Sequence, residues 1–207
     1  MSTDETILDR LAIRELVENW SIYRDNREWE RFLTVWHDDG VMMTTWGGKA
    51  TPQQFVEAAT KGFAKGDRML HIVGGVTSLV EGDRGFAMSK LRIQQRGPVE
   101  GVICDVVCIG VNFDFMERRD GRWGLVLRQP VYERDYLDPV DPNQEVELNP
   151  EIMERRPDGY QRLAYLQEGL GYTIKPDMPT EVGPGREALV AARAAWLRGE
   201  PLAWPQG

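Results

Sequence analysis

The sequence is poor in the residues that most metal and cofactor sites use. Its 207 residues include only two histidines, His37 and His71, and two cysteines, Cys104 and Cys108. Two histidines exclude a multi-histidine metal site, and the chain has no GxGxxG, P-loop, HExxH or CxxC motif. We therefore expect no cofactor and no metal, which leaves the chemistry that side chains alone can perform.

Long apolar runs and basic clusters are also missing. No stretch approaches the roughly 20 apolar residues that a membrane span needs, and the acidic start MSTDETILDR lacks the order of a signal peptide. The formal net charge of −8 argues against a nucleic-acid surface, which needs clustered Lys and Arg. These absences predict a cytoplasmic protein with neither a nucleic-acid nor a membrane partner.

The two cysteines stand four residues apart on an expected strand. At this spacing Cys104 and Cys108 would lie about 13 Å apart, which is too far for a disulfide. Unpaired cysteines fit a reduced compartment. We interpret both as small buried hydrophobic residues, with Cys108 also a candidate for a cavity wall.

Apolar periodicity predicts three helices in the first part of the chain. Residues 4–22 form an amphipathic helix that RDNRE ends, and residues 28–38 form a second that DDG ends. VMMTTW at 41–46 reads as a strand and GGK at 47–49 as a turn. TPQQ opens the third helix, with Pro52 in its first turn. His37 is then expected at an exposed helix end.

Four long segments rich in β-formers follow from Arg68, separated by short turns. Consecutive strands joined by short turns make an antiparallel meander. Helices followed by strands, rather than alternating with them, predict the α+β class. The remainder, residues 139–207, contains two helical candidates but too few apolar residues for a core of its own. We expect this C-terminal extension to pack on the domain of residues 1–138 or on a neighbouring subunit.

Three polar residues interrupt apolar segments in positions that suggest chemistry. Asp25 follows the first helix, His71 lies in MLHIV, and Arg128 lies in LVLRQPV. Two of them have an ordinary structural interpretation: a helix cap for Asp25 and a hydrogen-bonded core residue for His71. A buried Arg128 needs a partner, so it is seldom there for packing alone. Together they could act as an acid–base site, because a carboxylate fixes the tautomer of a histidine and a guanidinium stabilises an anion.

Three segments resemble the nuclear transport factor 2-like superfamily in its SnoaL-like branch. They are LAIRELVENWSIYRDNREWERFLTVWHDDG, the strand around His71, and FMERRDGRW. Within that branch they are similar to the group of hexachlorocyclohexane dehydrochlorinase, scytalone dehydratase and bile-acid dehydratase, over about residues 5–137. The resemblance implies an α+β cone, in which a strongly curved, mostly antiparallel sheet packs on three N-terminal helices around a pocket. It also implies a catalytic dyad of Asp25 and His71, with Arg128 as an active-site arginine.

The resemblance implies a cofactor-independent lyase that acts on a small apolar, aromatic or alicyclic substrate. The reaction would be dehydration, dehydrohalogenation or retro-aldol release of an aldehyde, the last because the tail is similar to extended members that release formaldehyde from lignin-derived compounds. An isomerase or cyclase, or a binding module for a hydrophobic ligand, is the alternative. Folds of this kind commonly form homodimers or homotrimers, and we expect the same here.

The sequence also departs from the group near the expected site. Where the dehydrochlorinase has a Lys five residues before its Asp, this chain has Trp20, and Tyr23 is the tyrosine nearest to the place of one in the bile-acid dehydratase. We therefore assign Tyr23 an assisting catalytic role. The side chains expected to bind substrate, with ordinary core packing as the alternative for most, are Trp20, Trp36, Met42, Trp46, Phe63, Cys108 and Asn112. Asp105 or Asp114 could add a second carboxylate, a choice that strand parity leaves open.

Overall fold

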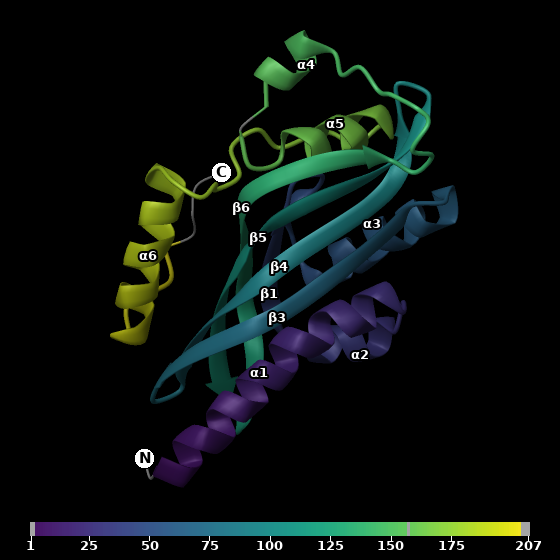
Figure 1. Ribbon diagram of the computed structural model, residues 1–207. Helices are drawn as coiled ribbons and strands as arrows, with labels where there is room; N and C mark the ends of the chain where they lie inside the picture. The colour runs from purple at the N-terminus through teal and green to yellow at the C-terminus, as the bar shows by residue number, and fades with distance from the viewer. Residues whose placement is uncertain (1–2, 157, 204–207) are drawn as a thin grey trace.

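The fold is a six-stranded curved sheet with helices on both of its faces (Figure 1). The computed structural model describes residues 3–156 and 158–203. Its helices are α1 (Thr3–Asp25), α2 (Trp29–Thr34), α3 (Pro52–Lys65), α4 (Pro150–Glu154), α5 (Gln161–Gly169) and α6 (Pro184–Leu197). Its strands are β1 (Trp36–Thr44), β2 (Gly48–Ala50), β3 (Arg68–Glu81), β4 (Arg84–Val99), β5 (Val102–Arg119) and β6 (Arg122–Pro139).

The predicted meander and the α+β cone are confirmed. Strands β3 to β6 pair antiparallel in chain order, and the full sheet order is β2-β1-β6-β5-β4-β3. Strand β1 joins the free edge of β6 in parallel, as the one exception to the antiparallel pattern among the described strands. Among these residues no helix has the length and apolar character needed to cross a membrane.

Helix α1 places the residue that ends it. Its buried positions Ile13, Val17, Trp20 and Arg24 follow the spacing of one helix face, and this face packs on the sheet. Asp25 is the last residue of the helix, so it lies where α1 meets β3. Burial of this helix face therefore fixes both the direction of α1 and the position of the Asp25 carboxylate.

The second helix is shorter than the sequence predicts. It ends at Thr34, and Trp36, His37 and Asp38 belong to β1, where Trp36 pairs with Leu125. Pairing with β6 overrides the helical periodicity of this segment. The expected exposed position of His37 is wrong as well: the residue is buried, and its Nε2 lies 2.8 Å from the carbonyl oxygen of Glu117.

Helix α3 begins and ends as its sequence predicts. The Thr51 hydroxyl accepts from the amide of Gln54, and the Gln54 side chain accepts from the amide of Thr51, which makes a capping box. Pro52 occupies the first turn. Gly66 ends the helix with φ of 101°, a left-handed conformation that glycine adopts without strain.

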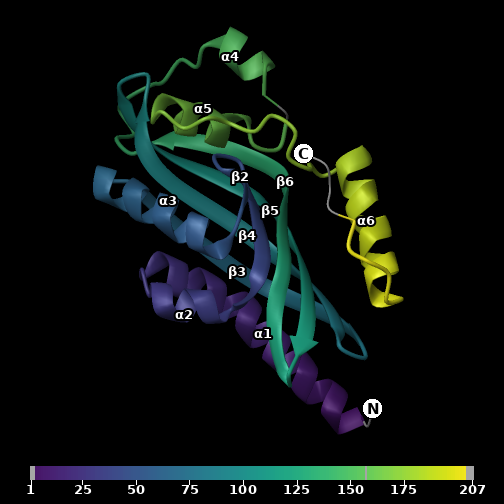
Figure 2. The ribbon, with the colours of Figure 1, turned by 180° about the vertical axis from the view of Figure 1, so that it is seen from behind.

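The segment after β6 contacts the sheet of its own chain through α5, through α6 and through the stretch between them, where the Tyr132 amide donates to the Pro179 carbonyl oxygen at 2.9 Å. Helix α5 packs on β4, β5 and β6, where Leu166 lies so close to Gly97 that a Cβ there would be 2.8 Å from it. Helix α6 lies on the other side of the sheet from α1, α2 and α3 (Figures 1 and 2). The indole Nε1 of Trp196 in α6 donates to the carbonyl oxygen of Gly85 at 2.9 Å.

Candidate active site

Asp25 and His71 meet where the end of α1 packs on β3. The Oδ1 atom of Asp25 lies 2.9 Å from Nδ1 of His71, and its Oδ2 accepts from the His71 backbone amide at 2.6 Å. A carboxylate at Nδ1 holds the proton on that nitrogen and leaves Nε2 as the proton acceptor. Within residues 3–156 and 158–203 the structure gives Nε2 no hydrogen-bond partner. The pair is therefore arranged as an oriented general base.

The surroundings set the charge of both groups. Burial raises the pKa of the Asp25 carboxyl, but the hydrogen bond and charge of His71 and then the charge of Arg24 outweigh it, so this pKa lies below its usual value. Burial, and after it the positive charge of Arg24, hold the pKa of His71 below its ordinary 6.5, although the hydrogen bond and the charge of Asp25 raise it. At neutral pH the carboxylate is ionised and the imidazole is a free base.

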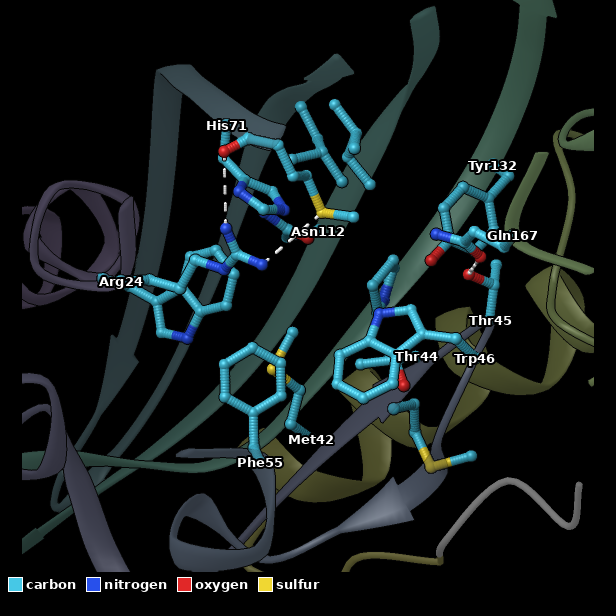
Figure 3. Close-up of a pocket in the computed structure, with 16 residues that line it drawn as sticks. Arg24, Met42, Thr44, Thr45, Trp46, Phe55, His71, Asn112, Tyr132 and Gln167 are labelled. Atoms are coloured by element: carbon cyan, nitrogen blue, oxygen red, sulfur yellow. Dashed lines mark hydrogen bonds between the residues drawn. The ribbon is translucent and has the colours of Figure 1, made fainter. Parts of the chain in front are cut away.

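A narrow, mostly apolar cavity lies beside His71 (Figure 3). The cavity and its opening contain about 440 Å³ that no atom fills, but the centre of a water molecule can reach only about 30 Å³ of it. The reachable part holds about two waters, so a larger guest requires side chains to move. The walls consist of Trp20, Arg24, Met42, Met43, Thr44, Thr45, Trp46, Phe55, Met69, His71, Leu91, Ile93, Asn112, Pro130, Tyr132 and Gln167.

Four of the predicted substrate-binding residues lie on these walls: Trp20, Met42, Trp46 and Asn112. The Trp20 indole meets the His71 ring edge-on, with centroids 5.3 Å apart. Asn112 donates from Nδ2 to the Ser89 hydroxyl at 3.3 Å. The structure therefore brings these four side chains together with the imidazole of the dyad.

Arg128 is close to the site but does not line the cavity. Its Nε and Nη2 donate to the two carboxylate oxygens of Asp114 at 2.7 Å each, and both side chains are fully buried. The guanidinium carbon lies 4.6 Å from the centroid of Trp20, which does line the cavity. Asp114 is thus the carboxylate that turns inward, and it holds Arg128 behind the indole.

Tyr23 and Trp36 also lie away from the cavity. Tyr23 precedes Arg24 on the helix, which turns it about 100° from that residue, and the guanidinium of Arg31 stacks on its ring at 5.8 Å. Trp36 packs against Phe32 with ring centroids 6.1 Å apart, inside the core beneath α2. Trp36 is therefore a core residue, which is the alternative interpretation, and does not line the cavity.

Phe63 and Cys108 do not line the cavity either. Phe63 lines an outer groove and a smaller hollow next to the cavity, and Arg24 and Arg27 place their guanidinium carbons 4.9 and 4.4 Å from its ring centroid. Cys108 is covered by the segment before α5, where its Sγ donates to the carbonyl oxygen of Gly159 at 3.3 Å. Both cysteines are free and buried, as expected.

Sequence analysis missed several residues of the site. Arg24 has the clearest signal, because it follows Trp20 by four positions and so shares its helix face. Thr45 and Gln167 have no signal in the sequence, because their contact joins distant segments. The Thr45 hydroxyl donates to the Gln167 side chain at 2.6 Å across a separation of 122 residues. Gln167 also donates to Gln95 at 3.1 Å. Through Gln167, helix α5 supplies part of the cavity wall.

The match to a family model identifies the chain. Residues 5–129 match the model of the SnoaL-like domain, and the chain belongs to that family. Pea pathogenicity protein 2 from Fusarium vanettenii is 34% identical to it over 209 aligned residues, which cover 96% of this chain and 90% of that protein. A PEP2-like protein from the same fungus is also 34% identical, with the same coverage.

Solved structures share the fold over a smaller part of the chain. A hexachlorocyclohexane dehydrochlorinase of type 3 from Novosphingobium barchaimii covers 70% of this chain and 99% of its own, with 21% identity and a TM-score of 0.58. A putative scytalone dehydratase from Novosphingobium aromaticivorans covers 70% and 100%, with 17% identity and a TM-score of 0.54. The chain therefore shares the cone fold with a dehydrochlorinase and a putative scytalone dehydratase.

Proposed function

We propose that the protein is a cofactor-independent lyase in which His71, oriented by Asp25, removes a proton from a small, mostly apolar substrate. One observation carries the proposal: the partly buried carboxylate of Asp25 lies 2.9 Å from Nδ1 of an imidazole that lines an apolar cavity. General-base assistance of this kind contributes about 10²- to 10⁴-fold to a rate. The dehydrochlorinase and dehydratase relatives support elimination as the reaction class.

The walls favour an aromatic or alicyclic substrate. Trp20, Trp46 and Phe55 offer flat apolar surfaces, and Met42 and Met69 are flexible enough to adapt to a guest. Arg128 supports the Trp20 indole from behind the cavity wall, which is a positioning role in place of the leaving-group contact that the resemblance implies. Tyr23 receives no role in this scheme, because its ring is stacked beneath Arg31.

The proposal is tested by activity against a panel of substrates. Purified wild-type protein is assayed for dehydration, dehydrohalogenation and aldehyde release, beside His71→Ala and Asp25→Asn. His37→Gln is the matched control, because His37 is the other histidine and lies away from the cavity. We expect at least about a 100-fold loss in both dyad variants and little change in the control. Full activity of either dyad variant would refute the mechanism.

Product analysis in deuterated water separates elimination from the alternatives. A lyase releases a small molecule, whereas an isomerase or cyclase returns the proton elsewhere and leaves the substrate mass unchanged apart from deuterium. A binding module converts nothing in the panel while still retaining a hydrophobic ligand. The hydrogen bond between Asp25 and His71 supports an enzyme over a binding module, because polar groups in an apolar wall are costly unless they are used.

We also propose that the chain forms a cytoplasmic homodimer or homotrimer. Strand β3 is an edge of the sheet and exposes Leu70 and Ile72, with Leu79 further along it. An open edge with apolar side chains is suited to pairing with another copy. The free thiols of Cys104 and Cys108 are in keeping with a reduced compartment.

A further inference from the structure

Arg24 carries a buried guanidinium whose carboxylate-binding edge is not occupied by a carboxylate. Its side chain is 5% exposed and lines the cavity beside His71. Nη1 donates to Asp25 Oδ1 at 3.0 Å and contacts the Met69 carbonyl oxygen at 3.5 Å. Nε is buried without a partner, and Nη2 meets only the Met69 sulfur at 3.5 Å. Two donors of a buried cation thus lack an oxygen acceptor.

Two other arginines of the chain show how this edge binds a carboxylate. Arg128 uses Nε and Nη2 together to hold both carboxylate oxygens of Asp114. Arg96 uses the same two atoms to hold both oxygens of Asp105, at 2.8 and 2.6 Å. The side-by-side pair of donors matches the spacing of two carboxylate oxygens. Arg24 presents the same pair, and the carboxylate that it hydrogen-bonds, Asp25, lies on Nη1 instead.

Met69 covers the open edge of Arg24. A thioether sulfur is a weak hydrogen-bond acceptor, and the unbranched side chain moves with little cost. Met69 also lines all three adjoining spaces: the cavity beside His71, the smaller hollow next to it, and the outer groove that includes Asp25. It is therefore the side chain that a guest entering from the groove would have to displace to reach Arg24.

The charge of the cavity wall favours an anion. Of the described residues that line it, none is Asp or Glu, and Arg24 is the one that carries a full positive charge. The neighbouring Asp25 already accepts from the backbone and ring of His71 as well as from Arg24, so its negative charge is shared among three donors. A buried cation in this position gains most from a second carboxylate that arrives with a ligand.

We propose that the Nε and Nη2 edge of Arg24 binds the carboxylate of an aromatic acid and replaces the Met69 thioether. The assignment rests on the proposed function in one respect, that the bound acid is the substrate of the dyad. Because Asp25 Oδ1 contacts both Arg24 and the His71 ring, an acid held by Arg24 lies next to the imidazole. Its carbon skeleton then packs against the Trp46 and Phe55 rings, which line the same cavity as Arg24 and His71 and contact each other with centroids 5.7 Å apart.

The test compares carboxylates with their neutral amides in binding to the full chain at pH 7.5. The probes are benzoate, trans-cinnamate and 2-naphthoate, each beside its primary amide, and the dissociation constants come from calorimetry or ligand-observed NMR. In at least one pair we expect the carboxylate to bind about 10- to 100-fold more tightly than the amide. Arg24→Gln removes this preference, and Arg24→Lys, which keeps the charge without the paired donors, restores only part of it.

Two controls separate this inference from the proposed function. Asp25→Asn lowers turnover by at least about 100-fold but leaves Arg24 in place, so it retains the carboxylate preference. Met69→Leu removes the sulfur from the edge and keeps or increases the preference. Equal binding of acid and amide in every pair, binding of no carboxylate at all, or a preference that survives in a folded Arg24→Gln protein would each overturn the assignment. The wild-type comparison decides the matter even if a variant is unstable.

Discussion

Asp25 accepts two hydrogen bonds from the same residue: one from the His71 ring at 2.9 Å and one from the His71 backbone amide at 2.6 Å. The carboxylate therefore fixes the position of the strand and the orientation of the imidazole at once. Since α1 carries Asp25 as its last residue, packing of the helix on the sheet also sets the acid–base pair.

The pH dependence of activity follows from the lowered pKa of His71. Burial and the charge of Arg24 hold this pKa below 6.5, and the base form is lost as pH falls through it. We expect kcat/KM to stay level from neutral pH down to 6.5 and to decline below that value. Asp25→Asn removes the charge that raises the pKa, so its residual activity should decline at still lower pH.

The same shift gives stability a defined pH dependence. Because the folded-state pKa of His71 is below the unfolded value, the unfolded chain takes up a proton first as pH falls. The free energy of unfolding should therefore decrease as pH drops below 6.5, measured by urea titration. His71→Asn should flatten that slope, and an unchanged slope would show that His71 is not buried as a neutral group.

The Asp114–Arg128 pair predicts a large stability effect. Asp114→Asn leaves a fully buried guanidinium without its counter-charge and should lower the free energy of unfolding by about 3–5 kcal/mol. The double variant Asp114→Leu with Arg128→Met removes both charges and should recover most of that loss. Denaturant titrations measure both, and a single variant that is as stable as the wild type would contradict the buried pairing.

Gly110 predicts a packing effect next to the cavity. A Cβ there would lie 2.1 Å from the carbonyl oxygen of Val131 on β6, so Gly110→Ala must push β5 and β6 apart. We expect a loss of about 3 kcal/mol. Gly74→Ala is the matched control, because nothing lies within 4 Å of its Cβ, and it should change stability by about 0.5 kcal/mol.

The oligomer can be tested at the edge strand. Light scattering after size exclusion should give two or three times the chain mass, and Ile72→Lys should shift the protein toward the monomer, because it places a charge on an exposed apolar edge residue. A wild-type protein of one chain mass would contradict the proposed assembly.

Local pattern was enough to predict most of the elements and part of the site. Residue spacing along the first helix predicts its buried face, which includes Trp20 and Arg24. Asp25 follows this face directly at the end of the helix. The strand residues His71 and Asn112 follow from the long β segments, because polar groups stand out in them. These positions depend on short-range periodicity, which a single sequence records.

The remainder depends on contacts between distant segments. The Thr45–Gln167 hydrogen bond forms only because α5 docks on the sheet, and no periodicity in the tail predicts where it docks. The same docking covers Cys108, which shares a strand with Asn112. The helical spacing around Trp36 predicts a helix there, but pairing of β1 with β6 decides its conformation.

The tautomer of His71 tests the central claim most directly. The two histidines can be assigned in a ¹⁵N–¹H long-range NMR spectrum with His37→Gln, which leaves a single imidazole. At pH 7.5 we predict a neutral His71 ring with its proton on Nδ1 and a bare Nε2. A proton on Nε2, or a charged ring at that pH, would contradict an imidazole that Asp25 holds ready to accept a proton from a guest in the cavity.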